Sequence, residues 1–165
     1  MRDAGAVHVC NSRAPTFTHD LTAALHATGA TIAFDAIGGG KLASTILTCM
    51  EAALSQTWTA YSRYGTPVHK QVYLYGNLDT SPTEIVRNVG MYWSVGSWLL
   101  FPFMEKIGAF ATHALRQRVA RELKTTFASG YAKHISFTDV LRPEAIQTFG
   151  KRSTGTKYLI NPSVV

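Results

Sequence analysis

The chain has 165 residues, of which 46% are hydrophobic, so it is long enough for one core with a small appendage. Cys10 and Cys49 lie far apart in apolar segments, a pattern that indicates neither a zinc site nor a disulfide framework and favours a reducing cytoplasm. The formal net charge is +6, and the excess falls in residues 81–165, which carry eleven basic and five acidic side chains. A solvated helix, an anionic cofactor or nucleic acid would each explain that excess. The first six residues lack an apolar run, so no export signal is expected.

Three apolar segments, residues 7–11, 31–35 and 72–76, predict strands, and the segments between them predict helices. The first helix begins after Pro15 and ends before Gly29, a residue that suits a helix end. Strands that alternate with helices are typical of a parallel sheet with crossovers. Such sheets bind ligands at the carboxyl ends of their strands, so nucleotide binding at the turn after Asp35 is the first hypothesis.

A second helix is predicted to begin near Lys41, directly after the glycines at residues 38–40. Its apolar face carries Leu42, Ile46, Cys49, Met50 and Ala53. Residues 58–71 contain three aromatic side chains and are expected to extend this helix and then turn. Beyond the next strand, residues 77–82 are expected to form a loop and residues 83–88 one helical turn.

The second half of the chain contains the clearest amphipathic pattern. Apolar side chains recur at every fourth residue across 107–127, and the basic residues mostly face away from them. The apolar positions are Ile107, Ala111, Leu115, Val119, Leu123 and Phe127. A short strand at residues 135–137, a helix from Pro143 and a last strand at residues 157–161 are predicted to follow.

No charged residue occurs between Asn88 and Met104, a length that approaches a membrane span. Glycines, polar residues and Pro102 interrupt this stretch, and a buried strand followed by a turn would produce the same composition. The strand is the favoured interpretation, and no membrane association is expected.

The segment from Gly38 to Lys41 invites comparison with a phosphate-binding loop. That motif requires a glycine where Asp35 stands and a serine or threonine where Leu42 stands, so the spacing argues against it. Asp35 also resembles the acid that grips a ribose hydroxyl, but the glycine fingerprint expected about twenty residues earlier is reduced to Gly5. Asp35 is therefore either a capping or turn residue or a ligand contact.

The sequence offers no catalytic constellation and no metal site. Its six histidines show no pairing at metal-ligand spacing, and the surroundings of Ser97 lack the frame of a serine nucleophile. A solvated or packed role is expected for each histidine.

Four blocks, taken in order, resemble the medium-chain dehydrogenase/reductase superfamily, near its alcohol dehydrogenase-like quinone oxidoreductase branch. These blocks are AGAVHVCN at residues 4–11, GATIAFDAIGG at 29–39, VYLYGN at 72–77 and GTKYLINP at 155–162. The resemblance covers only the C-terminal portion of such proteins. It implies an α/β fold, with a partial Rossmann-type parallel sheet and flanking helices in residues 1–128. Residues 129–165 would be a C-terminal segment that completes the catalytic domain.

The resemblance also implies cofactor contacts at several positions. Asn11 and Ser12 would lie near the adenine ribose, and Ala36, Ile37 and Gly38 would face a ribose from the strand end. Tyr75, Gly76 and Asn77 would line the nicotinamide side, and Lys151 or Arg152 would reach a cofactor phosphate. The cofactor would be NADP or NAD, with NADP favoured. The strand at residues 91–97 would pair two copies into a homodimer.

By this resemblance, the chain would be the NAD(P)-binding portion of a cytoplasmic oxidoreductase that transfers hydride between a nicotinamide and a carbonyl, quinone or activated alkene. It would lack the glycine-rich pyrophosphate turn and the catalytic half, so the isolated chain is expected to be inactive and to bind cofactor weakly. The alternative is a noncatalytic basic module that contacts nucleic acid or an acidic protein, although a cationic helix face is usually only solvated.

Overall fold

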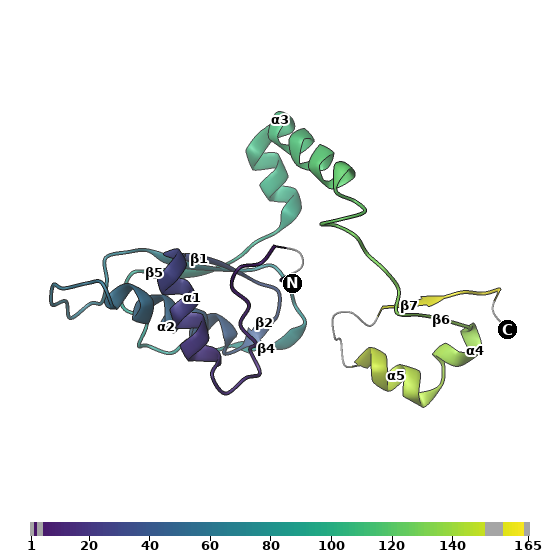
Figure 1. Cartoon of the computed structure of the whole chain (residues 1–165), viewed down its shortest axis with the longest axis horizontal. Helices are drawn as coiled ribbons and strands as arrows, with labels where there is room; N and C mark the ends of the chain where they lie inside the picture. Colours follow the sequence, from purple (N-terminus) through teal and green to yellow (C-terminus); the bar gives the residue numbers. More distant parts are fainter. Residues whose placement is uncertain (1, 3–4, 151–156, 164–165) are drawn as a thin grey trace. The chain divides into compact units, whose positions relative to one another are not determined.

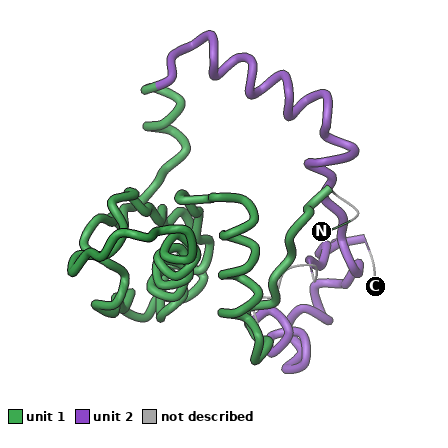
Figure 2. The backbone as a smooth tube through the Cα atoms, turned by 60° about the vertical axis from the view of Figure 1, so that its left-hand side comes forward, with its two compact units in different colours: residues 1–106 green, residues 107–165 purple. Residues whose placement is uncertain are grey.

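The structure is a computed structural model that describes residues 2, 5–150 and 157–163. The chain divides into two compact units, residues 1–106 and residues 107–165 (Figure 2). We describe each unit by itself. The predicted division at residue 128 concerns the cofactor-binding and catalytic roles of the two parts, and it stays a prediction.

Unit 1 alternates strands and helices along the chain (Figure 1). Its elements are α1 (Phe17–Thr28), β1 (Ile32–Asp35), β2 (Gly38–Gly40), α2 (Leu42–Ser55), β3 (Lys70–Leu74), β4 (Asp79–Thr83) and β5 (Trp93–Ser97). The strands β1, β3 and β5 form a three-stranded sheet in that order, and both pairings are parallel. The predicted strands at residues 31–35, 72–76 and 91–97 are therefore confirmed, with ends that differ by one or two residues.

The core of unit 1 lies between α2 and one face of this sheet. Leu47 and Met50 of α2, Val72 of β3 and Val89 are at most 1% exposed and belong to one cluster. The helix α1 packs on α2 and adds Leu25 to that cluster. The apolar face predicted for α2 is confirmed in part, because Cys49, Met50 and Ala53 are buried and Ile46 packs against the cluster. Leu42 is only half-buried, and the fully buried Leu47 was not on the predicted face.

The helix α1 ends as predicted. Gly29 has a φ of 63°, in the left-handed region, and its N–H donates to the Leu25 carbonyl. Only glycine adopts this backbone freely, so the glycine stops the helix and turns the chain into β1.

Residues 7–11 do not form the predicted strand. They carry no strand pairing, and Val7 is 82% exposed. An apolar, β-branched segment becomes a strand only when a neighbouring strand accepts its backbone hydrogen bonds, and the described residues place none beside it.

Two further local predictions are wrong. Residues 77–82 were expected to form a loop, but β4 occupies residues 79–83 and pairs in parallel with β2. Residues 83–88 contain no helical turn, and residues 58–71 do not extend α2, which ends at Ser55. In both regions the backbone conformation depends on hydrogen bonds to residues that are distant in sequence. Local periodicity does not predict those partners.

Unit 2 begins within the helix α3 (Leu100–Arg121), which is broken at Gly108, where φ is 80° and ψ is 171°. The predicted helix over residues 107–127 is thus confirmed up to Arg121 and replaced by turns beyond it. The remaining elements are β6 (Lys133–Ile135), α4 (Phe137–Val140), α5 (Pro143–Gly150) and β7 (Tyr158–Ile160). The strands β6 and β7 pair in parallel. Helix α5 begins at Pro143 as predicted.

Within the described residues, no helix has both the length and the apolar composition that a membrane crossing requires.

Candidate functional site

The turn that follows β1 is built around a buried carboxylate. Asp35 is 2% exposed, and its Oδ1 accepts hydrogen bonds from the backbone N–H groups of Ile37 at 2.7 Å and Gly38 at 3.3 Å. Asp35 is therefore a turn residue, one of the two roles that its sequence position left open. Its Oδ2 is also buried and has no hydrogen-bond partner among the described residues.

The carboxyl ends of β1 and β3 cross at very short range directly after this turn. A Cβ atom built on Gly76 would collide with the Ala36 backbone, and one built on Gly38 would lie 2.6 Å from the Gly76 carbonyl oxygen. The Asp79 N–H donates to the Ile37 carbonyl at 2.9 Å and ties the two segments together. Both glycines are needed here because any side chain would separate the two backbones.

This crossing, which we call the strand-end crossing, consists of residues 36–38 and 76–79. Half of the cofactor residues that the resemblance implied lie in it, namely Ala36, Ile37, Gly38, Gly76 and Asn77. Ile37 and Tyr75 are 37% and 53% exposed at its edge, and Asn77 is also exposed. Ligands of parallel α/β sheets bind at such carboxyl ends, where backbone groups and exposed side chains are presented together. Whether these residues bind a cofactor stays a prediction.

The glycines at 38–40 form the strand β2 and not an open phosphate cradle. Gly38 and Gly40 pair with β4, and a Cβ on Gly39 would lie 2.7 Å from the Ser81 carbonyl oxygen. The amides that would hold a phosphate thus lie against another strand. The structure agrees with the spacing argument against a phosphate loop, and it corrects the expectation that these residues form a turn.

The charges around the glycine strand also oppose phosphate binding. The Asp79 carboxylate lies beside Gly39 and Gly40, and hydrogen bonds from the Ser81 hydroxyl and N–H hold the pKa of Asp79 below its usual range. The ammonium of Lys41 lies 3.7 Å from the Glu84 carboxylate. A negative group therefore faces the glycines, and the nearest lysine already has an acidic neighbour.

Of the other residues implied for cofactor binding, Asn11 and Ser12 do not join the strand-end crossing. Asn11 and Ser12 lie in an exposed turn, in which the Asn11 side-chain oxygen accepts from the Arg13 N–H at 3.0 Å. Lys151 and Arg152 lie outside the described residues.

A buried ion pair in unit 1 was missed by the sequence reasoning. Lys70, which is 0% exposed, lies 2.6 Å from the Glu51 carboxylate, and that carboxylate also accepts two hydrogen bonds of 2.8 Å from Thr66. Burial raises the pKa of Glu51, but the hydrogen bonds from Lys70 and Thr66 outweigh it, so the pKa lies below its usual range. The pair joins α2 to the start of β3, and the hydrogen bonds from Thr66 hold the intervening loop to the same carboxylate. The sequence signal that could have revealed this pair was the acidic residue Glu51 among the apolar residues of α2.

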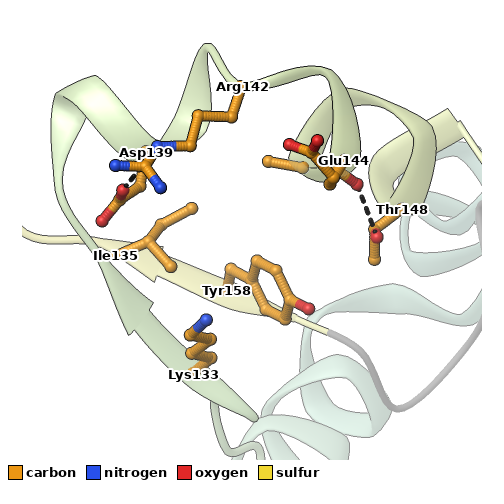
Figure 3. Close-up of a pocket in the computed structure, with 8 residues that line it drawn as sticks. Lys133, Ile135, Asp139, Arg142, Glu144, Thr148 and Tyr158 are labelled. Carbon is orange, nitrogen blue, oxygen red and sulfur yellow. Dashed lines mark hydrogen bonds and ion pairs between the residues drawn. The ribbon is translucent and has the colours of Figure 1, made fainter.

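Unit 2 contains an open pocket of about 390 Å³, shown in Figure 3. Its lining comes from β6, β7 and the two short helices: Lys133, Ile135, Asp139, Arg142, Glu144, Ala145, Thr148 and Tyr158. The Arg142 guanidinium lies 3.1 Å from the Asp139 carboxylate, and Thr148 donates to the Glu144 carbonyl. The Arg142 and Asp139 side chains thus neutralise each other at one end of the pocket. Sequence reasoning did not single them out, because their types and spacing match no motif.

No group of three histidine, cysteine or acidic side chains in the described part of the chain is placed to hold a metal ion.

Comparison with known proteins finds a likeness among solved structures. No family model and no curated protein matches the chain. Among solved structures, its fold is similar to that of a Mesorhizobium loti protein provisionally named an NADPH:quinone reductase, with a TM-score of 0.62 and 20% sequence identity. The match covers 98% of this chain and 42% of that protein.

The chain thus spans about two fifths of the length of the solved protein. At 20% identity the likeness shows the fold alone. It confirms the expected α/β fold, with parallel strands of the Rossmann type and flanking helices, and it agrees with the family resemblance found in the sequence.

Proposed function

We propose that the chain is the nicotinamide-dinucleotide-binding portion of an oxidoreductase. The reaction would be hydride transfer between NADP(H), favoured over NAD(H), and a carbonyl, quinone or activated alkene. The proposal is carried by the strand-end crossing, which lies at the carboxyl ends of parallel strands in a fold similar to a provisionally named NADPH:quinone reductase. The cofactor would supply the hydride chemistry, and the protein would supply binding and orientation.

The described residues suit the ribose or nicotinamide of a dinucleotide but not its pyrophosphate. Ile37 after β1, with Tyr75 and Asn77 after β3, presents exposed side chains that suit a ribose or nicotinamide, beside the closely spaced backbones of Ala36 and Gly76. A pyrophosphate needs free amides at a helix N-terminus, whereas the glycines before α2 are paired with β4. We therefore expect weak NADPH affinity and no turnover for the isolated chain.

An NMR titration tests the proposal. NADPH added to ¹⁵N-labelled chain should shift the amide signals of residues 36–38 and 75–77, with smaller effects from NADH. Tyr75→Ala should weaken these shifts, while Tyr61→Ala, a matched change at a 94% exposed tyrosine in a distant loop, should not.

Two results would contradict the proposal. One is an absence of shifts at the strand-end crossing at millimolar NADPH. The other is binding of single-stranded RNA or DNA that weakens steeply with added salt, which would favour the noncatalytic basic module instead.

We also propose that β5 pairs two copies of the chain into a homodimer. The position of β5 at the edge of the three-stranded sheet supports this, because an unpaired edge is a template for another strand. The Trp98 N–H donates to the Leu74 carbonyl of β3. Because the N–H groups of successive residues in a strand point to opposite sides, the Ser97 N–H points away from β3. Ser97→Pro should remove that outward donor and yield monomers by sedimentation, while Ser97→Ala should leave the dimer. A wild-type chain that sediments as a monomer would refute this proposal.

A further inference from the structure

The pocket of unit 2 has an apolar wall that is held in place by neighbouring residues. Lys133 and Ile135 are two residues apart in β6, so their side chains lie on the same face of the strand. Tyr158 of β7 pairs in register with Lys133 and is half-buried, and Ile135 is 4% exposed. The ring of Phe149 meets the Tyr158 ring edge-on at 5.5 Å and restricts its position. The side chains of Ile135 and Tyr158 therefore offer a fixed apolar surface inside the pocket.

Four charged side chains line this pocket, and two of them already neutralise each other. The Arg142 guanidinium lies 3.1 Å from the Asp139 carboxylate. The side chains of Lys133 and Glu144 are both exposed, and neither makes an ion pair or a hydrogen bond with any residue that the structure describes. One cation and one anion thus line the same cavity without a partner in the described part of the chain.

The two unpaired charges lie on opposite sides of the pocket. Figure 3 shows the Lys133 ammonium on the side of β6 and the Glu144 carboxylate at the start of α5, with the Tyr158 ring between them. The Lys133 and Glu144 side chains form no ion pair with each other, so a ligand has room between them. This arrangement is a positive group, an apolar surface and a negative group in sequence across one cavity.

We propose that the pocket binds a small zwitterion whose ammonium and carboxylate stand at opposite ends of a short hydrocarbon chain, as in an ω-amino carboxylate. The carboxylate contacts Lys133, the ammonium contacts Glu144, and the hydrocarbon lies against Ile135 and Tyr158. The cavity volume of about 390 Å³ lies in the range of small-molecule sites. The proposal goes beyond cofactor binding, because it concerns a different unit and requires no nicotinamide.

Ligands of other charge types fit this pocket less well. A phosphate or a simple carboxylate would be attracted by Lys133 but repelled by Glu144, and a simple amine would meet the reverse. An uncharged apolar ligand would remove both side chains from water without giving either a partner. A ligand with one charge of each sign at its two ends satisfies Lys133 and Glu144 together.

An NMR titration of the ¹⁵N-labelled full chain with ε-aminocaproate tests the proposal. Amide signals of residues 133–135 and 144–148 should shift and saturate in the millimolar range, because exposed charge pairs contribute little to affinity. Added salt should weaken the binding, because it screens both charges.

Three control ligands have the same number of carbon atoms. Hexanoate carries only the negative charge, hexylamine carries only the positive charge, and norleucine carries both charges at the same end. Each control should bind roughly threefold to fivefold more weakly than ε-aminocaproate, which is the effect of losing one exposed charge contact.

Charge reversal provides a sharper readout than loss of binding. Lys133→Glu places two carboxylates in the pocket and should change the preferred ligand to hexamethylenediamine, whereas Glu144→Lys should change it to adipate. The double reversal should restore ε-aminocaproate binding, with the ligand turned around. Lys124→Glu, a matched reversal at an exposed lysine outside the pocket lining, should leave the preference unchanged. Circular dichroism checks that each variant is folded.

Three outcomes overturn the proposal. They are an absence of shifts in residues 133–135 and 144–148 at concentrations well above millimolar, equal binding of ε-aminocaproate and norleucine, and an unchanged ligand preference in folded Lys133→Glu. None of these assays contains NADPH. Failure of this proposal would therefore leave the proposed function untouched, and a chain that binds no NADPH would leave this inference standing.

Discussion

The two units of the molecule bury their apolar residues to very different extents. In unit 1, Leu47 and Val89 are 0% exposed at the centre of a cluster that joins two helices and a sheet. In unit 2, Ile135 is the one buried apolar side chain among the described residues, and Phe110 of α3 is 90% exposed. Both units contain well-formed helices, so helix formation and core formation are separate outcomes.

The difference teaches that an amphipathic pattern specifies a helix and a face, but not what covers that face. The apolar positions of α2 are covered by β3 and α1, whereas Leu115 and Val119 of α3 remain more than 40% exposed. Apolar burial contributes roughly 25 cal/mol per Å², so only unit 1 gains substantially from its pattern within this chain. The predictions below test this contrast.

The largest effect is expected from breaking the buried ion pair of unit 1. Glu51→Ala leaves the Lys70 ammonium buried without its carboxylate and should lower the free energy of unfolding by about 3–5 kcal/mol. All three tryptophans lie in residues 58–98, so fluorescence during urea unfolding reports on unit 1. The double variant Glu51→Leu with Lys70→Met should recover most of the loss, because it removes both charges. A single variant as stable as the wild type would contradict the assigned role.

A cavity in the core of unit 1 should have the next largest effect. Leu47→Ala should cost about 3 kcal/mol, because it removes a fully buried side chain from a packed cluster. The same change at Leu115, which is 44% exposed in unit 2, should cost less than about 0.5 kcal/mol. Chemical denaturation followed by circular dichroism measures both. Equal losses would show that α3 is covered in solution.

Acid should destabilise unit 1 through Glu51. The pKa of this residue is lowered in the folded chain, so its contribution to stability is present above the unfolded pKa and lost as the pH falls through the folded pKa. Unit 1 should therefore lose stability below about pH 4. Glu51→Gln should flatten that dependence, and Glu105→Gln, at an exposed position, should not. Identical pH profiles for wild type and Glu51→Gln would contradict this assignment.

The smallest effect is expected from a helix cap in unit 2. The Ser136 hydroxyl accepts a hydrogen bond from the Asp139 N–H at 3.1 Å and caps α4. Ser136→Ala should cost about 1 kcal/mol locally and accelerate hydrogen exchange at that amide. Ser163→Ala, at an exposed serine near β7, provides the control. Unchanged exchange at Asp139 would show that the cap does not hold the helix.

Local sequence signals predicted α1, the start of α2 and the strands β1, β3 and β5 of unit 1. Pro15 and Gly29 bracket α1, and the alternation of strands and helices indicated the parallel sheet that β1, β3 and β5 form. The failures share one cause. Residues 7–11 have strand propensity without a neighbour, and β4 lacks strand propensity but has a neighbour in the glycines of β2.

The candidate site was predicted in part. The family resemblance pointed to the strand ends after β1 and β3, and the structure brings these residues into close contact. The resemblance could not show that the Asp35 carboxylate shapes the turn. Nor could it show that Gly38 and Gly76 are required where the two backbones cross. The Glu51–Lys70 pair was missed because its partners lie nineteen residues apart and meet only when α2 packs on β3.

The sequence by itself determined where α1 begins and ends, where α2 and α5 begin, and that the fold is α/β with parallel strands. These properties depend on side-chain spacing and on residues such as Gly29 that restrict the backbone locally. The tertiary structure decided which apolar faces are covered and which strands find partners. It also decided that the glycines after Asp35 form a strand paired with β4. Those outcomes depend on hydrogen bonds and contacts between distant segments, which local periodicity does not encode.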